Sequence, residues 1–181
     1  MKKIICITAL LALSACNETP KNETLVAIPT INKDESQTPN KSFTQYKQSA
    51  KSLVKLIEEK ADNNQIEKSA EALVALSQPI IQAFKVKFPQ CNEYLSAVSE
   101  AASIIPSLPL AEIETGYHAD GKLPRITDVK CYHAKDLLVH PATVQAMAVI
   151  GIESDEQREK AKHEVVEVIE HFTQVEQAYQ G

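Results

Sequence analysis

Apolar side chains recur at spacings of three and four residues along most of the chain after residue 41. This is the period of an amphipathic helix, whereas a half-buried strand would show strict alternation. The chain also has only four glycines in 181 residues, which disfavours a turn-rich β-sandwich. We therefore predict an all-α fold, with residues 42–181 as a single helical domain.

Helix-breaking residues divide this domain into predicted helices. The first is expected over residues 42–61, the second over 64–88 with a kink at Pro79, and the third over 92–105. The last helix is expected over 154–180. Polar residues that begin three of these stretches are the expected N-caps: Ser42, Asn64 and Ser154, the last in a capping box with Gln157.

A long connection, residues 106–151, separates the third helix from the last. We expect a loop over 116–124, then a short helix capped by Thr127 or Asp128. A new helix is expected to start at Pro141, because the residue before a proline avoids the helical region. The predicted architecture is an up-and-down bundle of about four main helices with this connection between the third and the last.

The N-terminus has the layout of a secretory signal peptide. Two lysines follow Met1, and an apolar run extends from Ile4 to Leu13. This run is too short for a membrane-spanning helix, which needs roughly 20 residues. The final residues, Leu13-Ser14-Ala15-Cys16, resemble the lipobox of bacterial lipoproteins. The resemblance implies that residues 1–15 are removed as a signal peptide and that Cys16 is lipidated with diacylglycerol and an N-acyl chain.

The resemblance also implies a location for the mature protein. Residue 17 is Asn, whereas an Asp there commonly retains enterobacterial lipoproteins in the inner membrane. We therefore expect the lipid on Cys16 to anchor the chain to the outer membrane, facing the periplasm. The alternative is an ordinary secreted protein, cleaved near Ala15, in which Cys16 is a plain thiol.

Residues 16–41 are predicted to form a lipidated polar tether. They are rich in Asn, Thr, Lys, Glu and Pro, and such a segment buries too little apolar area to offset its ordering entropy. Alternatively, residues 25–31 pair as a small strand or dock on the domain. With 24 acidic against 19 basic residues, the chain has no net electrostatic attraction to nucleic acid, so we expect none as a partner.

Two cysteines remain for the folded domain. A disulfide between Cys91 and Cys131 is expected in an oxidising compartment. It would tie the start of the third helix to the start of the next one. The alternative, a redox or metal role for these thiols, lacks the usual Cys-x-x-Cys spacing.

The candidate chemistry lies around residues 118–143. His118, Asp120, His133 and His140, with Asp136 as an alternative carboxylate, have the ligand types that suit zinc or copper. Alternatively, His133 and His140 hydrogen-bond backbone carbonyls that the proline freed, and no cofactor binds.

A second line of polar residues lies on the last helix. His163, Glu167 and His171 follow one another at intervals of four residues. Such a line binds a divalent metal weakly, but a solvated polar face is the favoured interpretation.

Nothing after Cys16 forms a diagnostic catalytic motif. There is no Cys-x-x-Cys-His for covalent haem, no Gly-x-Ser-x-Gly and no Gly-rich phosphate loop. The leading hypothesis is therefore a non-enzymatic helical module that binds a periplasmic or envelope protein. The first alternative is a divalent-metal or small-ligand protein with its site around His118, His133 and His140. A third hypothesis is an enzyme in which His133 is a base oriented by Asp136 or Asp120.

Overall fold

The computed structural model describes residues 39–126 and 128–181, and every regular element in these two ranges is a helix. The predicted signal peptide, Cys16 and nearly all of the tether lie outside the described residues. The α-helices are α1 (Pro39–Glu58), α2 (Asn63–Lys87), α3 (Asn92–Ala101), α4 (Leu110–Ile113), α5 (Val129–Ile150) and α6 (Asp155–Gln180). Three short elements link them: the 3-10 turns η1 (Pro89–Cys91) and η2 (Ile105–Ser107) and the π-helix η3 (Glu114–His118).

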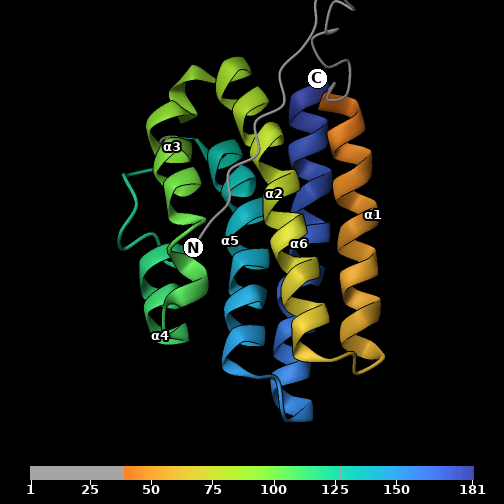
Figure 1. The fold of residues 1–181 in the computed structure, drawn as a ribbon. Helices are drawn as coiled ribbons and strands as arrows, with labels where there is room; N and C mark the ends of the chain where they lie inside the picture. The colour runs from red at the N-terminus through yellow and green to blue at the C-terminus, as the bar shows by residue number, and fades with distance from the viewer. Residues whose placement is uncertain (1–38, 127) are drawn as a thin grey trace, which may run out of the picture. The chain divides into compact units, whose positions relative to one another are not determined.

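The four long helices α1, α2, α5 and α6 form an up-and-down bundle. Neighbours in this bundle are antiparallel, so α1 and α5 run one way and α2 and α6 the other (Figure 1). The short helices α3 and α4 lie on the outer side of α5 (Figure 1). The predicted all-α bundle is thus confirmed, although its third long member comes from the predicted connection rather than from residues 92–105.

Helix α5 is the central helix of the domain. It packs against α2, α6 and α3, and every residue from Ala134 to Val144 is buried. Its polar side chains therefore have little solvent to hydrogen-bond and must find partners inside the protein. This burial is what brings polar residues of α5 together with those of α6.

The predicted break at Pro141 is wrong, because α5 continues through it as one helix of 22 residues. Proline has no amide hydrogen to donate to the carbonyl four residues earlier, that of Leu137. In this protein the Tyr46 hydroxyl donates to the Leu137 carbonyl instead, at 2.6 Å. A side chain from α1 thus replaces the hydrogen bond that the proline removes.

An aromatic cluster anchors α1 against α6. The rings of Tyr46 and Phe172 stack nearly parallel with centroids 5.6 Å apart, and Phe43 meets Phe172 edge-on at 5.7 Å. All three side chains are buried. The apolar positions predicted for the first helix therefore form the core, as their spacing indicated.

The helix caps agree only partly with the sequence patterns. Ser154 and Gln157 form the predicted capping box of α6, and Asp128 caps α5 by accepting from the Lys130 amide. Two caps were predicted wrongly. Asp62 rather than Asn64 caps α2, and Ser42 lies inside α1, which begins three residues earlier.

The predicted disulfide is confirmed. Cys91 and Cys131 are bonded, with an S–S distance of 2.08 Å and a sequence separation of 40. The bond joins η1 to the first turn of α5. It closes a loop that contains α3, α4 and η3, and so it restrains the segment that carries His118.

The loop predicted over 116–124 is partly helical, since η3 extends to His118. The chain then turns through Asp120, whose φ is +59°. Gly121 follows, and a Cβ there would lie 2.3 Å from the Thr115 carbonyl oxygen. Glycine is therefore required for the close turn that returns the chain to α5.

Candidate metal centre

A cleft of about 390 Å³ lies among η3, α5 and α6. Four of the chain's five histidines line it, and the fifth, His133, packs its ring on that of His171 with centroids 5.1 Å apart. The lining is mostly ionisable: Glu114, His118, Ala119, Tyr132, His140, His163, Glu164, Glu167 and His171. All of these residues come from 114–171 of the sequence.

Helix geometry explains why these residues meet. On α5 the residues His133, Asp136 and His140 follow the spacing i, i+3, i+7, which places them on one face. Glu164, Glu167 and His171 have the same spacing on α6. Because α5 and α6 are antiparallel (Figure 1), the start of one polar row meets the end of the other. His140 thus faces Glu164, and Asp136 faces His171.

The first donor group consists of His133, Asp136 and His171. Each offers one ligand atom, and these three atoms lie within 4.8 Å of one another. His133 Nδ1, Asp136 Oδ2 and His171 Nδ1 each expose less than 1 Å² of surface, and none has a hydrogen-bond partner among the described residues. His171 Nδ1 lies 2.7 Å from Asp136 Oδ2, but the two do not meet in hydrogen-bond geometry.

The second donor group consists of His118, His140 and Glu164, also within 4.8 Å. Glu164 Oε2 lies 2.7 Å from His140 Nδ1 and 3.7 Å from His118 Nε2. His118 Nε2 also lies 2.9 Å from the Thr143 hydroxyl. In contrast to the first group, the two imidazoles of this group already have polar partners.

The two groups adjoin each other through His140. Its Nδ1 faces Glu164, while its Nε2 lies 3.7 Å from Asp136 Oδ1. The imidazole rings follow one another in the order His118, His140, His171. Their centroids are 4.7 Å apart for His118 and His140 and 6.1 Å apart for His140 and His171. The donors therefore form one continuous row across the α5–α6 interface.

Burial keeps these imidazoles neutral. It lowers the pKa of His140 to about 4 and lowers the pKa of His118, His133 and His171 below the usual histidine value. Burial also raises the pKa of Asp136 to about 7. The close contact of His171 with Asp136 is thus not a fully charged pair. A neutral imidazole is the form that binds a metal ion.

Asp120 belongs to a different cluster. Its Oδ1 accepts hydrogen bonds from the Tyr94 hydroxyl at 2.8 Å and from Lys135 Nζ at 3.0 Å. Lys135 is fully buried and also donates to the carbonyls of Tyr117 and His118. The predicted ligand Asp120 therefore joins neither donor group. It helps to hold the turn next to His118.

The geometry of the donor groups is compatible with a small divalent ion. Zinc binds imidazole nitrogen at roughly 2.0–2.1 Å, so two ligands lie at most about 4.2 Å apart. Donor atoms within 4.8 Å reach that arrangement after side-chain shifts of less than about 1 Å. Imidazole with carboxylate is the ligand set that zinc and copper share.

The sequence identified half of these donors. His118, His133 and His140 were predicted as one cluster, whereas the structure divides them between the two groups. Asp136 was named only as an alternative. Glu164 was missed, and His171 was assigned to a solvated face although its side chain is only 24% exposed. The alternative was that His133 and His140 hydrogen-bond the backbone carbonyls freed by the proline. It is wrong for the Leu137 carbonyl, because the Tyr46 hydroxyl donates to it.

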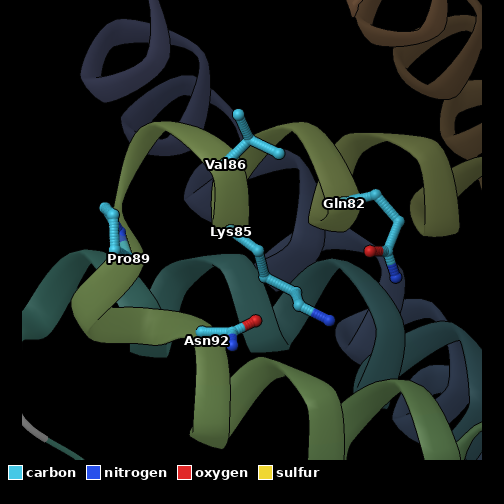
Figure 2. Close-up of a pocket in the computed structure, with 5 residues that line it drawn as sticks. All are labelled: Gln82, Lys85, Val86, Pro89 and Asn92. Atoms are coloured by element: carbon cyan, nitrogen blue, oxygen red, sulfur yellow. The ribbon is translucent and has the colours of Figure 1, made fainter.

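A second hollow lies where α2 ends and α3 begins. It measures about 400 Å³ and is lined by Gln82, Lys85, Val86, Pro89 and Asn92 (Figure 2). This lining contains no histidine, cysteine or carboxylate. The hollow thus offers no set of metal donors, and the α5–α6 cleft is the stronger candidate site.

Comparison of the chain with protein-family models, with curated proteins and with solved structures gives no match. Within residues 39–126 and 128–181, none of the helices combines the length and the apolar character that crossing a bilayer requires. The cleft and the N-terminal sequence are therefore the features that indicate a function.

Proposed function

We propose that this protein is a metal-binding lipoprotein of the bacterial cell envelope. Its primary site binds a divalent transition-metal ion through His133, Asp136 and His171. One observation carries the proposal: the three residues place donor atoms within 4.8 Å of one another, and His133 Nδ1, Asp136 Oδ2 and His171 Nδ1 are buried without a hydrogen bond among the described residues.

Energetics support a ligand at this position. A buried polar atom without a partner costs about 1–3 kcal/mol. His133 Nδ1 has no such partner, and Asp136 Oδ2 and His171 Nδ1 lie 2.7 Å apart without hydrogen-bond geometry. A metal ion would satisfy all three lone pairs at once. The histidines also converge beside an open cleft, which favours a ligand-binding role over a module that only docks on a protein partner.

The donor set indicates which ions bind. Two imidazoles and one carboxylate suit zinc or copper, whereas calcium and magnesium prefer sites made wholly of oxygen. Three protein ligands leave a coordination position for water or another ligand. The Cys91–Cys131 disulfide removes both of the domain's cysteines from the list of ligands, so thiolate binding is not part of the proposal.

The envelope location is proposed from residues 1–17 alone. Lipid on Cys16 and the polar segment 16–41 would hold the metal site near the membrane, in the periplasm and on the outer-membrane side. Labelling of cells with a palmitate analogue tests this: we expect label on the native chain and none on the Cys16→Ser variant. An unlabelled native chain would refute the lipid anchor and leave the metal proposal standing.

The metal proposal is tested on the purified full-length chain in detergent. After removal of metal with EDTA, Zn²⁺ and Cu²⁺ are titrated by calorimetry. We expect saturable binding, and we expect the His133→Ala/His171→Ala variant to lose the tightest binding step. His163→Ala is the matched control, because His163 also lines the cleft and is on α6 but belongs to neither donor group.

Two results would contradict the proposal. One is a native chain that binds neither ion. The other is a His133→Ala/His171→Ala variant that retains the tightest step while its circular dichroism shows a folded helical domain. Equal losses in this variant and in His163→Ala would also contradict it, since they would indicate only non-specific binding to surface histidines.

A further inference from the structure

We infer that the cleft holds a two-metal centre, in which His118, His140 and Glu164 bind a second divalent ion beside the first. This inference rests on the proposed function for the first ion. It adds a second site with different ligands.

The two donor groups are adjacent but share no residue. His118 reaches the second group from η3, His140 from α5 and Glu164 from α6, so three separate elements fix it. A single ion cannot use all six donors, because His140 Nδ1 points to Glu164 while Asp136 lies near the opposite ring nitrogen. Two ions, one on each side of the His140 ring, satisfy both groups.

The contact between Asp136 and His140 gives the two sites a physical link. Histidines that bind a metal through one nitrogen usually donate from the other nitrogen to a carboxylate, which fixes the ring and strengthens the ligand. His140 has Glu164 2.7 Å from Nδ1, and its Nε2 lies 3.7 Å from Asp136, which is longer than a hydrogen bond. If the ring moves closer to Asp136 when an ion binds, Asp136 would bind the first ion and orient a ligand of the second.

The cleft is also rich in carboxylates, which favour cations. Four carboxylates surround the histidines: Glu114, Asp136, Glu164 and Glu167. The ammonium of Lys135 lies 3.0 Å from Asp120 and 3.7 Å from Asp136. Carboxylates from η3, α5 and α6 thus offer oxygen ligands and a negative potential to a second divalent ion.

The second donor group also borders a further pocket. The side chains of His118 and Glu164 are 15% and 20% exposed, and both also line a smaller pocket of about 150 Å³. That pocket has apolar walls from Leu110, Ile113 and Met147. The second ion would therefore keep an open coordination position beside an apolar wall, where a small ligand can bind it.

Metal stoichiometry tests the inference on the full-length chain. After loading with Zn²⁺ and desalting, elemental analysis is expected to give two ions per chain for the native protein and for His163→Ala. The His118→Ala/Glu164→Gln variant and the His133→Ala/His171→Ala variant are each expected to give one. Loading with Cu²⁺ adds a proximity readout, since magnetic coupling in the electron paramagnetic resonance spectrum is expected in the native chain and in neither double variant.

The outcomes separate this inference from the proposed function. One ion per native chain, lost in His133→Ala/His171→Ala, would refute the second site and leave the first. No bound ion would refute both. Two ions in a folded His118→Ala/Glu164→Gln chain would place the second ion elsewhere and overturn the assignment. The Glu164→Gln single variant, which is nearly isosteric, repeats the measurement if the double variant fails to fold.

Discussion

The hydroxyl of Tyr46 on α1 donates a 2.6 Å hydrogen bond to the carbonyl oxygen of Leu137 on α5. That carbonyl is the one that Pro141, four residues later, leaves without its usual helical partner. Tyr46 is fully buried, and its ring stacks on Phe172. One side chain thus fills the core and also allows α5 to remain a single helix past a proline.

This relationship predicts a specific loss of stability in Tyr46→Phe. The substitution keeps the stacked ring but leaves the Leu137 carbonyl buried without a partner, which costs about 1–3 kcal/mol. In a Pro141→Ala background the backbone amide of residue 141 is available to that carbonyl, so the same substitution is expected to cost less than about 1 kcal/mol. Urea denaturation of the four chains measures both costs. Equal costs in the two backgrounds would show that Tyr46 does not compensate for the proline.

The helices of this fold could largely be predicted from the sequence, because apolar periodicity reports which face of a helix is buried. Phe43 and Tyr46 are core residues as their spacing indicated. The continuity of α5 could not be predicted in this way. It depends on a hydrogen bond between residues 91 positions apart, and no local pattern indicates that such a partner exists.

The candidate site could likewise be predicted only in part from the sequence. His118, His133 and His140 stand out by residue type, but Glu164 and His171 become donors only because α6 packs along a buried α5. On an isolated helix their polar row has the pattern of a solvated face. The clue in the sequence was that residues 131–143 are apolar on nearly all sides, which is typical of a central helix whose neighbours must match its polar residues.

Lys135 is predicted to be essential for the stability of the domain. Its buried ammonium donates to Asp120 and to the carbonyls of Tyr117 and His118, at 3.0–3.1 Å. Lys135→Met removes the charge and leaves these acceptors without their donor, so we expect a loss of about 3–5 kcal/mol. Chemical denaturation monitored by circular dichroism measures the change.

A matched control for Lys135 is available on α6. Lys160 forms a 3.0 Å ion pair with Glu156, but both side chains are exposed. Lys160→Met is therefore expected to change stability by no more than about 1 kcal/mol. If Lys135→Met were equally mild, the buried ammonium would not be the group that holds the turn after η3 against α5.

The Cys91–Cys131 disulfide is predicted to stabilise the domain mainly by restricting its unfolded chain. For a loop of 40 residues the chain-entropy relation gives about 4 kcal/mol. We expect the Cys91→Ala/Cys131→Ala variant to be less stable by that order, and dithiothreitol to lower the melting temperature of the native chain but not that of the variant. A native chain whose melting temperature is unaffected by complete reduction would contradict this.

Metal binding is predicted to stabilise the folded chain, because the donors converge only when α5 packs on α6. A ligand present at 100 times its dissociation constant adds about 2.7 kcal/mol to the free energy of unfolding. We therefore expect Zn²⁺ to raise the melting temperature of the native chain and EDTA to reverse the rise. In His133→Ala/His171→Ala most of this rise should be absent, while His163→Ala should keep it. Binding to the unfolded chain would lower the melting temperature instead, so the sign of the shift reports whether zinc recognises the assembled cleft or only histidines exposed by unfolding.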